Sequence, residues 1–323
     1  MISLITGGAG FIGSHLSEYL LKKGEEVHVI DNLSTGSMDN IRHLLKEPGF
    51  HCSTEDILNK SNTASIIGKC DHVYHLAASV GVKLVVENPL ESLRNNIRGT
   101  EVILDLAIRN KTKVLITSSS EVYGRNDKLP FTETDDRVYG SVYSTRWGYA
   151  FSKSIDEFMS LAYYREEGLP TVVARLFNTV GPRQTDTYGM VIPRFVRQAL
   201  SGRPLTVYGT GRQRRCFSDV MDVVGALYQL MQSDESIGDV YNIGSNNEIS
   251  IIDLAKKIIE LTRSSSKIIF VPYGDAYEEN FEDMSRRVPN LDKIMNAIDY
   301  VPNNSLDNII GRVIEFYKKE NSN

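Results

Sequence analysis

Three glycines near the start of the chain constrain its fold more than any other feature. Gly7, Gly10 and Gly13 lie in LITGGAGFIGSHL (residues 4–16), between a short apolar run and a segment with helical periodicity. A strand that passes through such a loop into a helix presents backbone N–H groups at the helix N-terminus, where a pyrophosphate can bind. We therefore expect a dinucleotide-binding βαβ unit here, in preference to a glycine-rich turn without a ligand.

The first half of the chain alternates strand-like and helix-like segments. Apolar runs predict strands at 2–6, 26–30, 72–77, 113–117 and 171–177. Apolar residues that recur every three or four positions predict helices at 12–23, 93–110 and 148–168. Uninterrupted apolar strands separated by helices indicate a doubly wound parallel sheet with helices on both faces, which is a Rossmann-like α/β fold.

The pattern becomes less regular after about residue 178, where Gly, Pro, Arg and Tyr are frequent. VYNIG (240–244) predicts a strand that returns to the first sheet, and 250–263 and 305–319 predict two more helices. We expect a first domain over 1–177, with a returning segment near 217–244. A smaller, mixed α/β substrate-binding domain is expected over 178–216 and 245–323.

Composition argues against several classes of function. The net charge of −5 disfavours binding to nucleic acid or to an anionic membrane, and no apolar run reaches membrane-spanning length. The N-terminus has no basic region before its apolar residues, so we expect no signal peptide. Three scattered cysteines (Cys52, Cys70 and Cys216) favour a cytoplasmic protein without a disulfide framework. All six histidines lie within the first 75 residues, without metal-binding spacings, so no metal site is expected.

Two acidic residues follow the glycine loop at informative positions. Asp31 ends the second predicted strand, where a carboxylate accepts hydrogen bonds from adenosine ribose hydroxyls and repels a 2′-phosphate. This placement predicts NAD in preference to NADP; the alternative is a turn residue before Asn32. Asp56 either contacts the adenine edge or caps a helix, and the sequence favours neither.

Tyr149 and Lys153 form the predicted catalytic pair, because a spacing of four residues places both on one face of a helix. A nearby ammonium favours the phenolate, so Tyr149 can act as a base on an alcohol. Ser119, in SSSEVYG at the end of a predicted strand, can hydrogen-bond the same hydroxyl. Tyr19 and Lys23 share the spacing but lie on the helix after the glycine loop. The alternative for Tyr149 is an aromatic residue that only packs its helix.

Several segments in combination resemble the extended short-chain dehydrogenase/reductase superfamily. Within it, they are most similar to the NAD-dependent epimerase/dehydratase family that acts on nucleotide-diphosphate sugars. The segments are TGGAGFIG, HLAA, SSSEVYG, YAFSK and RLFNTVGPR, together with Asp31, and the similarity covers nearly the whole chain. The resemblance implies that Tyr149 takes the proton of the sugar C4 hydroxyl while NAD accepts the hydride, which forms a transient 4-keto sugar. It also implies that Lys153 holds the nicotinamide ribose, that Ser119 orients the C4 oxygen, and that helices 93–110 and 148–168 form a four-helix homodimer interface.

The same resemblance extends to binding residues. The expected NAD contacts are Gly7, Gly10, Phe11, Ile12, Gly13, Asp31, Asn32, Asp56, Ile57, Leu76, Ala77, Ala78, Asn96, Ser118, Tyr149 and Lys153. The expected UDP-sugar contacts are Asn178, Arg183, Val191, Arg194, Thr206, Tyr208 and Arg215. Arg215 matches an arginine that contacts the diphosphate, and 205–208 matches a segment that lines the uracil. Arg183 and Arg194 either face a C6 carboxylate or form interdomain ion pairs.

Ser120 and Glu121 determine which reaction follows the 4-keto sugar. Nucleotide-sugar 4,6-dehydratases have an Asp–Glu acid–base pair here, and Ser120 cannot be that acid. UDP-glucuronate decarboxylases have Ser–Glu, as this chain does, and Glu121 is either a catalytic carboxylate or a support for its loop. Because YGMVIPRFV (188–196) and FEDMSRRVP (281–289) resemble bacterial 4-epimerases, we expect a 4-epimerase of UDP-glucose, UDP-N-acetylglucosamine or UDP-glucuronate first. A UDP-glucuronate decarboxylase is second, ahead of a dehydratase or an NAD-binding module without turnover.

Overall fold

A seven-stranded sheet forms the centre of the protein, in a computed structural model that describes residues 1–81, 87–186, 190–272, 274, 284 and 286–320. The strand order is β11-β6-β5-β4-β1-β2-β3, and every pairing is parallel. The strands are β1 (Ile2–Thr6), β2 (Glu26–Ile30), β3 (Phe50–Ser53), β4 (His72–His75), β5 (Lys113–Ser119), β6 (Thr171–Leu176) and β11 (Asp239–Ile243). The order reverses between β1 and β4, which is where ligands bind in such sheets.

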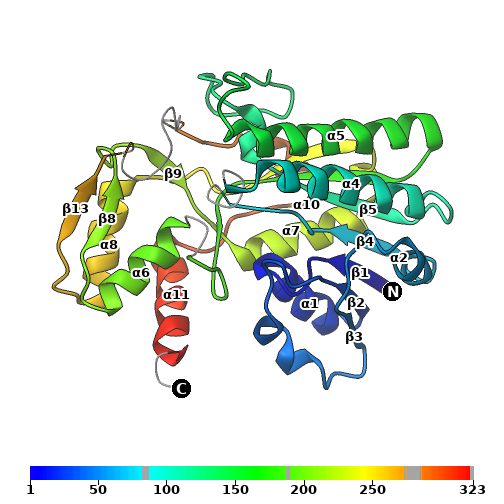
Figure 1. The fold of residues 1–323 in the computed structure, drawn as a ribbon, viewed down its shortest axis with the longest axis horizontal. Helices are drawn as coiled ribbons and strands as arrows, with labels where there is room; N and C mark the ends of the chain where they lie inside the picture. Colours follow the sequence, from blue (N-terminus) through cyan, green and yellow to red (C-terminus); the bar gives the residue numbers. More distant parts are fainter. Residues whose placement is uncertain (82–86, 187–189, 273, 275–283, 285, 321–323) are drawn as a thin grey trace.

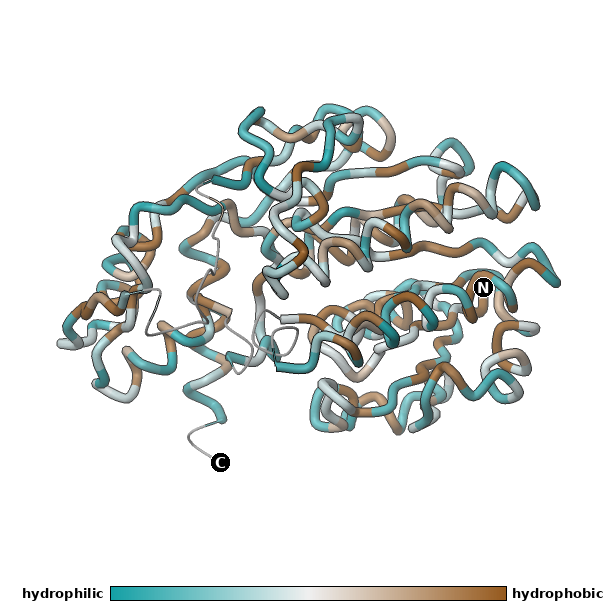
Figure 2. The backbone as a smooth tube through the Cα atoms, turned by 45° about the horizontal axis from the view of Figure 1, so that its top comes forward, coloured by the Kyte–Doolittle hydropathy of each residue, from teal (hydrophilic) through white to brown (hydrophobic). Residues whose placement is uncertain are grey.

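Helices cover both faces of this sheet (Figure 1). On one face lie α1 (Phe11–Lys22), α7 (Val220–Gln232) and α10 (Asp292–Ile298); on the other lie α2 (Lys60–Ile67), α4 (Pro89–Ala107) and α5 (Trp147–Glu167). Successive strand residues face opposite cores: Ile5 packs under α1 and α7, and Leu4 packs under α2 and α4. Hydrophobic and hydrophilic segments alternate along the surrounding helices, as expected of helices with one buried face (Figure 2).

A second group of elements packs around its own core (Figure 1, left). It contains α6 (Val191–Leu200), α8 (Ile251–Thr262) and α11 (Leu306–Glu320), with the strand pairs β8 (Leu205–Tyr208)/β13 (Ile268–Val271) and β9 (Arg214–Cys216)/β12 (Glu248–Ser250). The pair β7 (Thr179–Val180)/β10 (Ser218–Asp219) lies beyond the end of β6. Four short 3-10 helices complete the elements: η1 (Met38–Asn40), η2 (Arg42–Leu44), η3 (Ser120–Tyr123) and η4 (Asp234–Ser236).

The predicted α/β fold is confirmed, including the returning strand, since β11 pairs in parallel with β6. β3 was not predicted from the sequence, because this edge strand buries only Phe50 and lacks a continuous apolar run. The helices α2, α6, α7 and α10 were not predicted either. The segments 188–196 and 281–289 lie partly outside the described residues, and the division into two functional domains stays a prediction.

Two further expectations concern membranes and cysteines. Among the described helices, none is long and apolar enough to cross a membrane. Cys52, Cys70 and Cys216 are all free thiols.

Candidate active site

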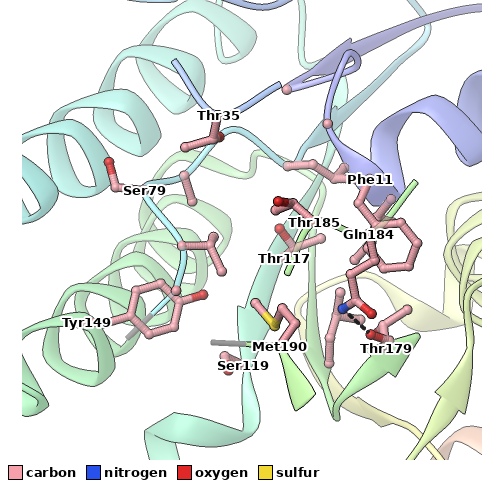
Figure 3. Close-up of a pocket in the computed structure, with 18 of the residues that line it drawn as sticks. Phe11, Thr35, Ser79, Thr117, Ser119, Tyr149, Thr179, Gln184, Thr185 and Met190 are labelled. Carbon is pink, nitrogen blue, oxygen red and sulfur yellow. Dashed lines mark hydrogen bonds between the residues drawn. The ribbon is translucent and has the colours of Figure 1, made fainter. Parts of the chain in front are cut away.

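One cavity of about 530 Å³ connects the two groups of elements. It begins at the carboxyl ends of β1, β2 and β4, passes β5 and α5, and continues to the start of α6 and to Tyr208 of β8. In Figure 3, Phe11 approaches from α1, Thr117 and Ser119 lie along β5, and Tyr149 projects toward them from α5. Nearly all of the predicted site residues line this cavity.

The glycine loop leaves no room for side chains. Gly7 has a φ of +72°, and a Cβ there would lie 2.8 Å from the backbone nitrogen of Ala77. A Cβ on Gly13 would lie 2.3 Å from the carbonyl oxygen of Gly7. The N-cap of α1 is Gly10, which provides no side-chain cap, so the first amides of α1 are available to an anion. Gly10, Phe11, Ile12 and Gly13 all line the cavity, which fits a bound pyrophosphate.

Asp31 lies at the end of β2 and accepts two backbone hydrogen bonds. Its Oδ2 is 2.9 Å from the amide nitrogen of Ala9, and its Oδ1 is 2.8 Å from that of Leu33. Burial raises the pKa of this carboxyl above its usual range, although both amides favour the charged form. Asn32 and Asp56 lie beside it in the cavity wall, joined by a 3.0 Å hydrogen bond from Asn32 Nδ2 to Asp56 Oδ2.

The wall opposite this carboxylate follows β4. Leu76, Ala77 and Ala78 line the cavity, as does Ile57. Asn96, one of the expected NAD contacts, does not line it. Its Oδ1 instead accepts from the amide of Ser79 at 2.7 Å, and its Nδ2 donates to Ser152 Oγ at 3.1 Å. Asn96 therefore holds the wall to α5 from behind, whereas its neighbour Asn95 faces the cavity.

Tyr149 and Ser119 meet across the cavity, between α5 and the end of β5 (Figure 3). A side-chain hydrogen bond joins them. Burial raises the pKa of Tyr149 above its usual value, as do the charges of Glu121 and Asp156, while Ser119 lowers it. Tyr149 is thus a neutral phenol in this structure, and it needs added positive charge nearby before it can act as a base.

Lys153 lies one helical turn beyond Tyr149 and also lines the cavity. Its Nζ lies 3.0 Å from Asp156 Oδ2, and both side chains are buried. The ammonium group of Lys153 thus lies at the cavity wall on the same helix as Tyr149, with its charge balanced by Asp156. The predicted pair is therefore assembled on one helix.

Glu121 forms ion pairs with two arginines. Its Oε1 lies 2.6 Å from Nη1 of Arg287, and its Oε2 lies 3.3 Å from Nη2 of Arg146. Although burial alone would raise it, the charges of these two guanidinium groups and that of Arg215 lower the pKa of Glu121 to about 2. Glu121 is therefore ionised at neutral pH and is a poor proton donor and a weak base.

Ser118 and Ser120 have different surroundings, although both line the cavity. Ser118 Oγ donates to Glu157 Oε1 at 2.5 Å, and this buried carboxylate also binds Arg175, with distances of 2.7 and 2.9 Å. Ser120 is buried at the start of η3, beside Glu121. Ser118 is thus fixed by a buried network that begins behind the cavity wall.

The far end of the cavity contains Asn178, Val191, Arg194, Tyr208 and Arg215. The guanidinium of Arg194 stacks 4.2 Å from the ring centre of Tyr208, and its Nη2 donates to the carbonyl of Thr206 at 3.1 Å. Thr206 itself does not line the cavity, because its hydroxyl accepts from Gln198 at 3.0 Å.

Arg183 does not line the cavity either. Its guanidinium forms an ion pair with Glu18 of α1 and donates to Ser14 Oγ at 3.1 Å. Of the two alternatives left open for this residue, the structure shows the ion pair. The arginines that do flank Glu121, Arg146 and Arg287, were missed by the sequence analysis. Their one signal in the sequence is position: Arg287 lies in FEDMSRRVP, and Arg146 lies three residues before Tyr149.

Comparison with known proteins agrees with this geometry. Residues 4–313 match the model of a family described as GDP-mannose 4,6 dehydratase. A UDP-N-acetyl-alpha-D-glucosaminuronate decarboxylase from Bacillus cytotoxicus is 42% identical over 319 residues, which cover 98% of this chain and 97% of the relative. UDP-glucuronic acid decarboxylase 1 from Xenopus tropicalis is 36% identical over 319 residues, which cover 98% of this chain and 72% of the relative.

The fold matches a solved enzyme with both ligands bound. The crystal structure of UDP-glucuronic acid 4-epimerase from Bacillus cereus, in complex with UDP-glucuronic acid and NAD, superposes with a TM-score of 0.89. It is 28% identical, and the match covers 99% of this chain and all of that one. The chain therefore belongs to the GDP-mannose 4,6-dehydratase family, among the NAD-dependent nucleotide-sugar enzymes of the short-chain dehydrogenase/reductase superfamily.

Proposed function

We propose that this protein is a UDP-hexuronate decarboxylase. The observation that carries the proposal is the Ser120–Glu121 pair, with Glu121 ionised between Arg146 and Arg287. A 4,6-dehydratase needs an acid and a base at these positions, and neither Ser120 nor a glutamate with a pKa of about 2 suits that task. The decarboxylases among the relatives support the same choice. We therefore place the decarboxylase before the 4-epimerase, which is the reverse of the order expected from the sequence.

Decarboxylation needs only a ketone at C4 and a carboxylate at C6. The residues at the cofactor end of the cavity, including Gly10, Gly13 and Asp31, would hold NAD, which would supply the hydride acceptor for C4 and restore the hydride after carbon dioxide has left. Tyr149 takes the C4 hydroxyl proton, and Ser119 holds the same oxygen. The C5–C6 bond then breaks, carbon dioxide leaves, and the electron pair comes to rest on the C4 oxygen as an enolate. Hydrogen bonds from Tyr149 and Ser119 stabilise that oxygen, and water supplies the proton that C5 gains.

Arg146 and Arg287 give this reaction its substrate class. Both line the cavity in the same wall as Glu121, and guanidinium groups bind carboxylates through paired hydrogen bonds. We assign them to the C6 carboxylate of the sugar, in place of Arg183. Glu121 then holds the two guanidinium groups in position between turnovers. Of the two roles considered from the sequence, this is the supporting role and not the catalytic one.

The sugar we favour carries a 2-acetamido group. The relative from Bacillus cytotoxicus is described as acting on UDP-N-acetyl-glucosaminuronate, and it aligns over 97% of its own length. UDP-glucuronate is the second substrate we consider. Residues 1–177 and 217–244 are assigned to NAD, and 178–216 and 245–323 to the nucleotide sugar. In that part, Asn178, Val191, Arg194, Tyr208 and Arg215 supply the contacts.

We also propose a homodimer that forms through α4 and α5. Phe151, Ile155 and Phe158 form a stripe along α5 at helical spacing, with exposed fractions of 39%, 39% and 67%. An apolar stripe of this kind on a helix pair suits a second copy of the same pair. Light scattering should give twice the monomer mass, and Phe158→Glu should give the monomer; a monomeric wild type would contradict this arrangement.

The test of the reaction is a set of separate incubations with UDP-N-acetylglucosaminuronate, UDP-glucuronate and UDP-glucose, analysed by NMR and mass spectrometry. We expect loss of carbon dioxide from one or both uronates and a UDP-pentose product. UDP-glucose has no C6 carboxylate and serves as the matched control. A C4 epimer of unchanged mass would instead support the 4-epimerase, which the solved neighbour with UDP-glucuronic acid and NAD favours.

A further inference from the structure

Two histidines and one glutamate gather at the edge of the central sheet, away from the residues that line the cavity. Glu26 and His28 lie two residues apart on β2, and side chains at that spacing share one face of a strand. The parallel register places His51 of β3 directly beside His28. All three side chains therefore project from the same face of the sheet, where β3 is the last strand.

Their ligand atoms all lie within 4.8 Å of one another, close enough to converge on one ion after small side-chain movements. Nε2 of His28 lies 2.9 Å from Glu26 Oε1, and Nε2 of His51 lies 3.3 Å from the same oxygen. Two ligands that each lie about 2.0–2.1 Å from a tetrahedral zinc ion are about 3.3 Å from each other. The two imidazole rings are stacked with centres 4.6 Å apart, so at least one ring must turn out of the stack to direct both Nε2 lone pairs at one ion.

We propose that Glu26, His28 and His51 bind a divalent transition-metal ion, with Zn²⁺ as the first choice. Two histidines and one glutamate, with water in the remaining position, are an established ligand set for zinc. Imidazole nitrogen also suits Cu²⁺ and Ni²⁺, whereas Mg²⁺ and Ca²⁺ prefer sites built from oxygen alone. Among the described residues this is the one group of three potential ligands whose atoms all lie within 4.8 Å of one another.

This site could not be predicted from the sequence, because only the pairing of β2 with β3 brings its ligands together. His28 and His51 are far apart along the chain, and neither belongs to a short metal-binding motif. The ion would join β2 to the short edge strand β3. That strand leads into residues 55–58, which line one end of the cavity. Because the ligands sit on strands, their positions are largely preset, and binding should stabilise this edge of the sheet.

The test is calorimetric titration of the full chain, freed of metal with a chelator, with ZnCl₂ at neutral pH. We expect one Zn²⁺ per chain in the wild type and loss of this binding in His51→Ala, whose ring is half-exposed and outside the core. The matched control is His43→Ala, which removes a histidine paired with a single carboxylate, Glu18, at 2.6 Å. That variant should bind Zn²⁺ as the wild type does. Titration with MgCl₂ should show no binding to the wild type or to either variant.

Thermal unfolding provides a second readout. Saturating Zn²⁺ should raise the melting temperature of the wild type and of His43→Ala, but not that of His51→Ala or Glu26→Gln. The proposal is overturned if the wild type shows no saturable one-to-one binding. It is equally overturned if His51→Ala keeps both the binding and the thermal shift.

Discussion

The two ends of the cavity each contain one largely buried carboxylate, and the two are held in opposite ways. Asp31, at the cofactor end, accepts from the backbone amides of Ala9 and Leu33, and burial raises its pKa. Glu121, at the sugar end, lies between Arg146 and Arg287, whose charges lower its pKa to about 2. The charged form of a carboxylate is therefore disfavoured at the cofactor end and strongly favoured at the sugar end.

This difference extends to the rest of each end. The cofactor end is shaped by backbone atoms, since Gly7 and Gly13 each lie against main-chain atoms that would clash with a Cβ. The sugar end is shaped by side-chain pairs, such as Ser119 with Tyr149 and Lys153 with Asp156. Substitutions at the first end should therefore affect NAD binding, and those at the second should affect turnover and the choice of sugar.

Tyr149→Phe should separate the two ends most sharply. Loss of the phenolic hydroxyl removes the acid–base group, so we expect kcat to fall by about 10²–10⁴-fold while NAD binding persists. The control is Tyr19→Phe, which sits at the same spacing from a lysine, Lys23, but packs on Tyr228 instead of facing the cavity. Steady-state rates and NAD titrations of both variants measure this; full activity in Tyr149→Phe would contradict its role.

Gly13→Ala should damage the cofactor end. Its methyl group would lie 2.3 Å from the carbonyl oxygen of Gly7, and overpacking of this kind costs about 1–3 kcal/mol of stability. We expect a lower melting temperature and weaker NAD binding. Gly311→Ala, inside α11, adds a methyl group with no neighbour within 4 Å, so it should leave NAD binding unchanged and should not lower the melting temperature, since alanine favours a helix. NAD affinity equal to that of the wild type in Gly13→Ala would show that the loop can adjust.

Arg287→Gln tests whether the sugar end recognises a carboxylate. Hydrogen bonds to charged groups contribute about 1.5–3 kcal/mol, so kcat/KM for a UDP-uronate should fall by about 10- to 100-fold. The affinity for UDP alone, which has no carboxylate, should stay the same. Arg183→Gln is the control, because that arginine pairs with Glu18 outside the cavity. A larger loss in Arg183→Gln would favour the other alternative considered from the sequence, in which Arg183 faces the C6 carboxylate.

Asp31→Asn tests the charge at the cofactor end. The amide oxygen can still accept a backbone hydrogen bond, but the repulsion of a 2′-phosphate is lost. We expect the preference for NAD over NADP to shrink by about tenfold, since two charges near a protein surface interact by one to a few kcal/mol. Glu55→Gln, at the same end of the cavity, is the control and should change the ratio of NAD affinity to NADP affinity less. Fluorescence titration with both cofactors measures the preference.

A site residue could be predicted from the sequence when the groups that it contacts lie close to it along the chain. Gly13 and Asp31 were predicted because their partners, Gly7 and Ala9, are backbone atoms of the same βαβ unit. Tyr149 and Lys153 were predicted because one helix presents both. These features need only the chain geometry of a strand or a helix, which periodicity reveals.

The residues that sequence reasoning missed or misplaced have distant partners. Arg287 meets Glu121 from the far end of the chain, and no spacing rule connects the two. Arg183 and Arg194 looked equivalent in the sequence, but only Arg194 lines the cavity, while Arg183 is drawn to Glu18 on α1. Thr206 lies in a predicted uracil-lining segment, yet its side chain faces Gln198.

The last expected effect concerns stability in acid, where the two carboxylates should act with opposite sign. Glu121 has a folded pKa of about 2, below its usual 4.5, so its contribution is complete above pH 4.5 and is lost as the pH falls toward 2. Glu121→Gln should therefore flatten the acid loss of stability, by up to about 1.4 kcal/mol per pH unit. Asp31 has a raised pKa, so protonation favours the folded state, and Asp31→Asn should steepen the net loss on acidification. Urea unfolding of both variants between pH 5 and about pH 3 measures the slopes. Equal slopes in the two would mean that the arginines and the backbone amides hold their carboxylates equally, and the comparison between the two ends would fail.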